Sequence, residues 1–245
     1  MAKRGIPVLK KPGGNFCPGC GHNIFHRLIC EVIEELGYEN NQMMCFAIGC
    51  ACNHAAVFNG ENTMGPHGRP ASVATGVKRT NEEMLVTTYQ GDGDAYVIGL
   101  QDTFNAAYRN ERITQFVVNN TCFAMTGGQM GWTTLPGQKT ATSQTGRDTD
   151  TTGAPLKFPE LVRNDFNAAY AARGAVHNPK EIRKTKGYIR QALEAQIAGE
   201  GYSIVEAVSI CPTNWHMSVD QSIDFLEKEV LGAFELGEIV KRRGE

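Results

Sequence analysis

The most constraining stretch of the sequence covers residues 85–130, LVTTYQGDGDAYVIGLQDTFNAAYRNERITQFVVNNTCFAMTGGQM. It holds two short apolar runs, residues 85–88 and 113–118, of a kind typical of buried strands. Between them lies a run with the helical period, marked by Val97, Ile98, Leu100, Thr103, Phe104 and Ala107. A strand, a helix and a second strand form a βαβ unit with a parallel strand pair. The stretch therefore predicts an α/β fold with a mostly parallel central sheet and helices on both faces.

Polar segments follow both predicted strands. GDGD (91–94) comes after the first strand, and NN (119–120) comes after the second. Because the carboxyl ends of parallel strands open at the same sheet edge, we expect Asp92 and Asn120 to lie close together. A carboxylate and an amide oxygen suit Mg²⁺, which takes its other ligands from water and phosphate. The backbone oxygen of Cys122 is a further candidate ligand for the same ion.

The glycines of the first segment indicate the second half of such a site. Gly91 and Gly93 allow the backbone to approach a diphosphate closely, and the amides that open the next helix face an anion. On its own GDG also fits an ordinary turn, since Asp-Gly is a common turn pair. The downstream NN pair and the segment MTGGQ (125–129) favour the metal–diphosphate interpretation.

The bulk composition bounds the class of protein. At 245 residues and a net charge of −2, the chain suits one α/β domain over residues 1–245 and gives no electrostatic basis for nucleic-acid binding. No apolar segment is long enough for a signal peptide or a membrane span, so we expect a cytoplasmic protein. In that compartment eight cysteines indicate bound metal or reduced thiols rather than disulfides.

The cysteines form a second pattern. Cys17 and Cys20 have the C-x-x-C spacing of a zinc knuckle, an iron–sulfur ligand pair or a redox dithiol. Cys50 and Cys211 each follow a predicted strand, so the segments CPGC (17–20) and CPTN (211–214) are expected to close on one site. Four thiolates there suit a [4Fe–4S] cluster or a structural zinc ion. Cys52 could replace Cys50 as a ligand.

Other parts of the chain are assigned more coarsely. Cys30 and Cys45 are expected to be buried small hydrophobic residues. Residues 121–159 are irregular in pattern and are predicted to form a loop that covers the site. The remaining predicted elements are helices over 23–36, 71–78, 160–173, 178–198 and 220–243, strands over 43–48, 175–177 and 202–210, and a loop over 59–70.

Taken together, these segments resemble the thiamine diphosphate-binding β subunit of 2-oxoacid:ferredoxin oxidoreductases. The resemblance rests on segments that stand in the family's order: CPGCGH (17–22), IGC (48–50), HGR (67–69), ATGVK (74–78), GDGD (91–94), NNTCFAMTGGQ (119–129) and CPTN (211–214). It implies the thiamine diphosphate-binding fold, with Mg²⁺ held by Asp92, Asn120 and Cys122. It also implies a [4Fe–4S] cluster on Cys17, Cys20, Cys50 and Cys211. Further cofactor contacts that it implies are Ile48, Gly49, Cys50, His67, Gly91, Gly93, Asp94 and Thr126.

The resemblance further implies the reaction, which is CoA-dependent oxidative decarboxylation of a 2-oxoacid with electron transfer to ferredoxin. A 2-oxoisovalerate-like acid or 2-oxoglutarate is the favoured substrate. His67 is the catalytic candidate, because an imidazole can hydrogen-bond an oxyanion or a carboxylate; the alternative is a structural loop histidine. Arg69 and Arg147 are candidates for contact with an anionic group or a neighbouring carboxylate. An α subunit is expected to supply the glutamate that activates the cofactor, and γ and δ subunits or domains are expected as well.

Two departures from the family pattern bear on these expectations. Asn119 stands where many relatives have Asp before the ligand Asn, and Gly127 stands where some have a Lys thought to help hold the 2-oxoacid. Two alternative classes also remain open. One is a non-oxidative thiamine-dependent decarboxylase or synthase subunit without a cluster, and the other is a zinc-stapled assembly protein.

Overall fold

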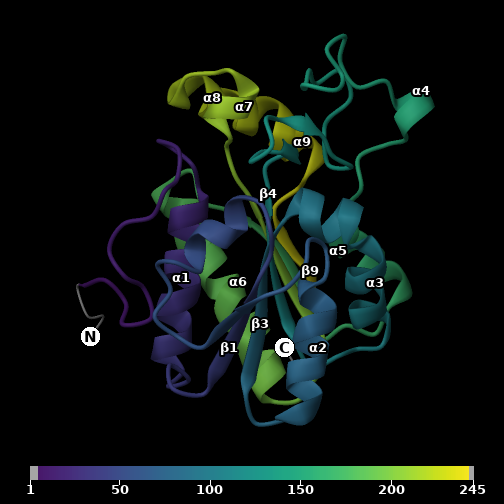
Figure 1. The fold of residues 1–245 in the computed structure, drawn as a ribbon. Coiled ribbons are helices and arrows are strands. Elements are labelled where there is room, and N and C mark those ends of the chain that lie inside the picture. The colour runs from purple at the N-terminus through teal and green to yellow at the C-terminus, as the bar shows by residue number, and fades with distance from the viewer. Residues whose placement is uncertain (1–4, 243–245) are drawn as a thin grey trace.

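A seven-stranded sheet with the strand order β2-β1-β3-β4-β8-β7-β9 forms the centre of the computed structural model, which describes residues 5–242 (Figure 1). Each neighbouring pair in it is parallel except β7 and β9, which are antiparallel. Its strands are β1 (Gln42–Phe46), β2 (Asn62–Met64), β3 (Leu85–Gly91), β4 (Thr114–Asn119), β7 (Tyr170–Ala175), β8 (Ser203–Val208) and β9 (Gly237–Val240). A separate antiparallel pair joins β5 (Cys122–Phe123) to β6 (Gln129–Met130). The mostly parallel sheet confirms the predicted α/β class.

Helices cover both faces of the sheet (Figure 1). On one face lie α1 (His22–Glu35) and α6 (Pro179–Ile197), and on the other lie α2 (Pro70–Thr80), α3 (Leu100–Tyr108) and α5 (Phe158–Asp165). The shorter helical segments are η1 (Cys50–His54), η2 (Asp94–Ile98), α4 (Thr149–Thr152), α7 (Pro212–Trp215), α8 (Val219–Phe225), η3 (Leu226–Val230) and α9 (Leu231–Ala233). Among residues 5–242, no helix is long and apolar enough to cross a membrane.

Local sequence explains the main elements. Every residue of β4 is buried, and so is every residue of β3 but Gly91, which fits strands covered by helices on both faces. Helix α6 starts as predicted: the Asn178 side chain accepts a hydrogen bond from the Glu181 amide at 2.9 Å, and Pro179 occupies the first turn. Helix α1 buries an apolar stripe that includes Phe25, Ile29 and Ile33.

Three predicted elements are wrong. Residues 170–173, assigned to the end of a helix, belong to strand β7, and the helix before them stops at Asp165; the strand predicted over 175–177 overlaps β7 only at Ala175. This alanine-rich segment has a high intrinsic helix propensity, but complete burial beside β8 decides its conformation. The tail predicted as one helix over 220–243 instead breaks at Phe234 and ends in β9, paired with β7; Arg243 lies outside the described residues. The loop predicted over 59–70 contains the short edge strand β2.

Candidate cofactor cleft and cysteine cavity

A narrow cleft lies at the carboxyl ends of β1, β3 and β4, with a cavity volume of about 40 Å³. The βαβ argument placed Asp92 and Asn120 at this edge, and both line the cleft. All of the cofactor-binding candidates named from the sequence line it: Ile48, Gly49, Cys50, His67, Gly91, Asp92, Gly93, Asp94, Asn120, Cys122 and Thr126. The structure therefore brings these residues, from four separate segments, to one place.

The Asp92 side chain is almost fully buried at the floor of the cleft, with 2% of its surface exposed. Its carboxyl accepts hydrogen bonds from the Gly93 amide at 3.0 Å and from the Thr133 hydroxyl. Burial raises the pKa of Asp92 to about 7, against those hydrogen bonds, which favour the charged form. Thr133 belongs to the long loop after β4, so that loop contacts the candidate site, and its contact with Asp92 has no signal in the local sequence.

The cleft has two arms: the segment GDGD (91–94), which carries Asp92, and the turn after β4, which carries Asn120. Asn120 is 5% exposed, and its backbone oxygen accepts a hydrogen bond from the Trp215 indole at 3.1 Å. Thr121 has a φ of 62°, in the left-handed region that a β-branched residue rarely adopts. Two other loop side chains stabilise this conformation: Thr134 donates to the Thr121 carbonyl at 2.5 Å and Gln138 donates to its hydroxyl at 2.7 Å.

The cleft wall includes open glycine backbone. At Gly49, which has a φ of 92°, and at Gly91, a Cβ atom would meet no heavy atom within 4 Å. Gly93 is the opposite case, because a Cβ there would lie 2.4 Å from the Phe123 ring. Accessible backbone beside a buried carboxylate and an amide oxygen is the donor set that a magnesium-bound diphosphate needs. The residues present therefore fit that group.

The catalytic candidate His67 is held by Asp94. Asp94 Oδ1 accepts hydrogen bonds from His67 Nδ1 and from the Gly68 amide, the latter at 2.7 Å, and Oδ2 accepts one from Gln90 Nε2 at 2.8 Å. Because Asp94 accepts three hydrogen bonds, the proton of the His67 ring lies on Nδ1. The other ring nitrogen of His67, Nε2, is therefore available to a group in the cleft. The side chain of His67 is 33% exposed and lines the cleft. The sequence singled out His67 but gave no sign that Asp94 orients it.

A larger cavity of about 360 Å³ adjoins the cleft and shares its residues Cys50 and Asn120. The four candidate cluster ligands, Cys17, Cys20, Cys50 and Cys211, all line it, whereas Cys52 is not among the described residues that do. Within residues 5–242, no group of three or more His, Cys, Asp or Glu side chains is arranged as a ready metal site. The thiols are neighbours: burial raises the pKa of Cys20 to about 11, and the charge of Cys211 adds to the rise. The four candidate ligands of a tetrathiolate group therefore share one cavity, without forming a metal site in the described part of the chain.

Cys211 has two polar neighbours. Hydrogen bonding from the Cys122 thiol lowers its pKa to about 6, against the effect of burial. The Asn214 amide donates to Cys211 Sγ at 3.3 Å and to the Ala124 carbonyl at 3.0 Å. Asn214 thus joins the CPTN segment to the loop that carries Cys122. The last residue of that motif is a position that sequence reasoning could have singled out and did not.

The remaining candidates have structural partners. Arg69 pairs with Asp102. Arg147 is 3% exposed and its guanidinium donates to carbonyl oxygens of its own loop, at Gly131, Trp132, Thr134, Thr152, Gly153 and Ala154. Cys30 and Cys45 are buried, as predicted. Two further histidines lie beside the cysteine segments. His22 Nδ1 is hydrogen-bonded to the Tyr89 hydroxyl at 3.0 Å, and His54 is buried against His26 and Tyr89.

Comparisons with known proteins agree with this geometry. Residues 40–207 match the family model of the thiamine pyrophosphate enzyme C-terminal TPP binding domain. The 2-oxoglutarate synthase subunit KorB of Archaeoglobus fulgidus is 32% identical over 200 residues, which are 81% of this chain and 70% of that protein. The chain therefore belongs to the thiamine pyrophosphate-binding subunits of the 2-oxoacid:ferredoxin oxidoreductases.

Two further comparisons refine that placement. The ketoisovalerate oxidoreductase subunit VorA of Methanothermobacter thermautotrophicus is 40% identical over 244 residues, which cover 97% of this chain but 51% of that protein. The chain thus spans about half the length of this relative. A solved 2-oxoglutarate:ferredoxin oxidoreductase from Magnetococcus marinus superposes with a TM-score of 0.80 over 100% of this chain and 88% of its own. At 22% identity, that likeness shows the fold.

Proposed function

We propose that this chain is the β-type subunit of a CoA-dependent 2-oxoacid:ferredoxin oxidoreductase that binds thiamine diphosphate with Mg²⁺ and one [4Fe–4S] cluster. The observation that carries the proposal is the meeting of two sites: the candidate cofactor residues line one cleft, and the four cysteines line the cavity that shares Cys50 and Asn120 with it. Such proximity suits a reaction that passes electrons from an organic cofactor to a cluster.

The two arms of the cleft would hold Mg²⁺ and the diphosphate. Asp92 would supply the charged oxygen, and Asn120 and the Cys122 carbonyl the neutral oxygens, for Mg²⁺. The backbone at Gly49 and Gly91 would lie against the diphosphate, where a side chain would occupy the open space. The rest of the cofactor would lie along Ile48, Cys50 and Thr126, which line the same cleft.

Thiamine diphosphate supplies a carbon nucleophile and an electron sink for decarboxylation of the 2-oxoacid. This chain's own contribution is a polar contact from His67. Because Asp94 fixes Nδ1 as the protonated nitrogen, Nε2 would accept a hydrogen bond or take a proton from a group in the cleft, and the resulting imidazolium would be stabilised by the Asp94 carboxylate.

Partners complete the site in this proposal. No glutamate lines the cleft within the described part of the chain, so an α subunit would supply the carboxyl group that activates the cofactor. Ile48 and Met125, on the cleft lining, are 36% and 48% exposed, which suits a covering subunit. Ferredoxin would receive electrons from the cluster on Cys17, Cys20, Cys50 and Cys211, and γ and δ subunits or domains would complete the enzyme. A 2-oxoisovalerate-like acid is the first substrate to test and 2-oxoglutarate the second, in line with the names of the 40% and 32% identical relatives.

The test begins with an anaerobic absorbance spectrum and metal analysis of the purified protein. The proposal expects a broad visible band that bleaches with dithionite and about four irons per chain. Cys50→Ser should lose the band, whereas Cys52→Ser, its matched control two residues away, should keep it. A colourless protein with bound zinc would contradict the cluster and favour the assembly-protein alternative.

Thiamine diphosphate binding is tested separately by calorimetry in the presence of Mg²⁺. Asp92→Asn should weaken binding by about 10- to 100-fold, as loss of a metal contact does, while the exposed Asp150→Asn should leave it unchanged. Tight binding of the cofactor by an iron-free protein would favour the non-oxidative decarboxylase alternative. Absence of binding by the unmodified protein would contradict the proposal as a whole.

A further inference from the structure

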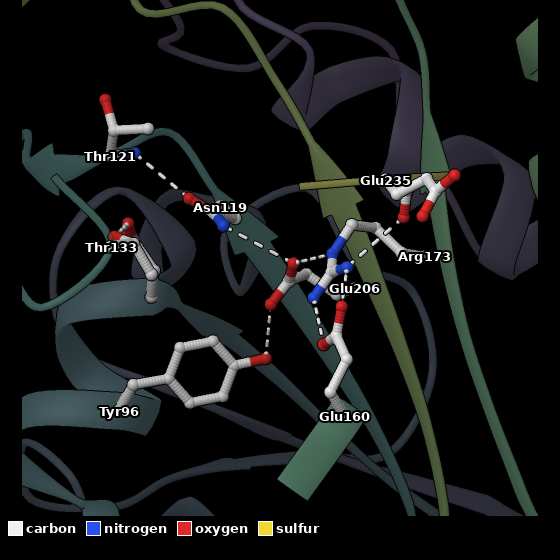
Figure 2. Close-up of polar contacts among 9 residues, drawn as sticks. Tyr96, Asn119, Thr121, Thr133, Glu160, Arg173, Glu206 and Glu235 are labelled. Atoms are coloured by element: carbon white, nitrogen blue, oxygen red, sulfur yellow. Dashed lines mark hydrogen bonds and ion pairs between the residues drawn. The ribbon is translucent and has the colours of Figure 1, made fainter. Parts of the chain in front are cut away.

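An ion-pair network with a fully buried centre lies beneath the cofactor cleft, and none of its charged residues was singled out from the sequence. Arg173 on β7 and Glu206 on β8 are register partners in the parallel sheet, and neither is exposed. Arg173 Nε donates to Glu206 Oε1 at 2.5 Å, and the other guanidinium nitrogens bind both carboxylate oxygens of Glu160 on α5 at 2.6 and 2.7 Å (Figure 2). Arg173 also donates to the Glu235 carbonyl at 3.2 Å. The guanidinium is thereby fixed in one orientation.

Glu206 accepts two further hydrogen bonds. The Tyr96 hydroxyl donates to Oε2 at 2.8 Å, and the Asn119 amide donates to Oε1 at 3.3 Å (Figure 2). A buried carboxylate with three donors has its hydrogen-bonding capacity largely used, which is what makes a buried charge tolerable. Each of the two additional donors comes from a different arm of the cofactor cleft.

Tyr96 connects the first arm of the cleft to Glu206. This residue lies on η2, the π-helical turn that follows GDGD (91–94), and it is fully buried. Its ring stacks on Phe158 of α5 with centroids 5.3 Å apart, so the phenol is held from the side as well. The bond to Glu206 therefore fixes the start of the helix whose preceding residues include Asp92.

Asn119 connects the second arm of the cleft to Glu206. Its amide nitrogen donates to Glu206, while its Oδ1 accepts a hydrogen bond from the Thr121 amide at 3.2 Å. These two contacts fix the orientation of the amide group, and the second one closes the turn in which Thr121 adopts its left-handed conformation. That turn carries Asn120 and leads into Cys122, the other two candidate ligands of Mg²⁺.

We propose that Glu206, held by Arg173, is a positioning residue that fixes the two arms of the Mg²⁺–diphosphate site relative to each other, through Tyr96 on one arm and Asn119 on the other. This inference rests on the proposed function of the cleft. It also explains the residue at 119. Asn can donate to Glu206 and accept from the Thr121 amide at once, whereas Asp at this position would accept only and would set a second carboxylate against Glu206.

The test uses two conservative variants and a matched control, in the full-length protein purified anaerobically with any subunits that accompany it. Tyr96→Phe removes the hydrogen bond from the phenol to Glu206 and keeps the ring. Asn119→Asp removes the hydrogen bond from the amide to Glu206 and keeps the shape of the side chain. The control is Tyr170→Phe, which removes the bond of an equally buried tyrosine to Glu238, on the β9 side of the sheet. The measured quantity is the Kd for Mg²⁺ at saturating thiamine diphosphate, with iron content and melting temperature measured alongside.

We expect each site variant to raise the Kd for Mg²⁺ by about 10- to 100-fold, with iron content unchanged and the control within about twofold. The fluorescence of Trp215, read in a Trp132→Phe background, should report the looser turn, because its indole donates to Asn120. Tyr96→Phe is the gentler change and stays informative if Asn119→Asp does not fold. Unchanged Mg²⁺ affinity in a folded Tyr96→Phe protein overturns the inference while leaving the function intact. Failure of the unmodified protein to bind thiamine diphosphate instead overturns the proposed function.

Discussion

Three buried histidines beside the cysteine cavity predict an unusual loss of stability at mildly acidic pH. His22, His26 and His54 lie 2%, 0% and 0% exposed, against each other and Tyr89. Burial lowers the pKa of His22 to about 4 and that of His26 to about 3, and it also lowers the pKa of His54 well below its usual value. Neither ring nitrogen of His54 has a hydrogen-bond partner. All three imidazoles are therefore neutral in the folded protein.

The direction of the pH effect on stability follows from the linkage between proton binding and folding. A histidine in the unfolded chain takes up a proton below about pH 6.5, whereas these three remain neutral in the folded protein until much lower pH. The unfolded state binds more protons in that window, so stability is complete above pH 6.5 and falls as the pH is lowered. His22 and His26 each cost about 2 kcal/mol between pH 7 and pH 5, and His54 changes the stability in the same direction.

His26→Phe isolates one of these contributions. Phenylalanine keeps the ring between Phe46 and Phe58 and removes the group that can take up a proton. Urea unfolding of the cofactor-free chain at several pH values should show that the variant gains about 2 kcal/mol relative to the parent between pH 7 and pH 5. The exposed His216→Asn is the control and should leave the pH dependence unchanged. If His26→Phe and the parent lose stability in parallel, His26 is not held neutral and the reasoning is wrong.

Three further perturbations test the site and the loop predicted to cover it. Gly93→Ala sets a Cβ against the Phe123 ring, so it should destabilise the protein by about 1–3 kcal/mol in thermal unfolding and abolish thiamine diphosphate binding in calorimetry. Asp94→Asn removes the carboxylate charge beside His67 and sets an amide nitrogen against Gln90 Nε2, so it should lower kcat about 10²-fold in a steady-state assay; an equal change in cofactor Kd would contradict an orienting role. Arg147→Met removes the donors to six loop carbonyls and should cost about 3 kcal/mol, with limited proteolysis faster within residues 131–154 and unchanged elsewhere.

The sequence sufficed for the elements whose pattern is local. The apolar runs around GDGD (91–94) and NN (119–120) defined two parallel strands, and parallel pairing alone brought Asp92 and Asn120 to one cleft. The C-x-x-C spacing of Cys17 and Cys20, together with the strand ends before Cys50 and Cys211, also placed these four residues at one cavity, although they are far apart in the sequence. The assignment of their ligand roles stays a prediction.

What the sequence did not give depends on contacts between distant residues. The strand β7 looks helical by composition, because alanine favours helices until burial between β8 and β9 overrides that preference. Arg173 and Glu206 each look like an ordinary surface charge in the printed sequence, and only the register of two neighbouring strands makes them partners. Thr133 reaches Asp92 from a loop without periodicity, so no spacing rule could have indicated it.

The place of β8 in the sheet has a consequence for how the protein is made. This strand is the last parallel strand in the sequence, yet it lies between β4 and β7, and its exit leads to Cys211. Until the ribosome has released residues 203–211, β7 has no parallel partner in the sheet and the cavity lacks the wall that carries Cys211. Non-local pairing of this kind slows folding, since long loops must close before any contact forms. A cluster held by all four cysteines, as proposed for this chain, could therefore be captured only after residues 203–211 have been synthesised and β8 has joined the sheet.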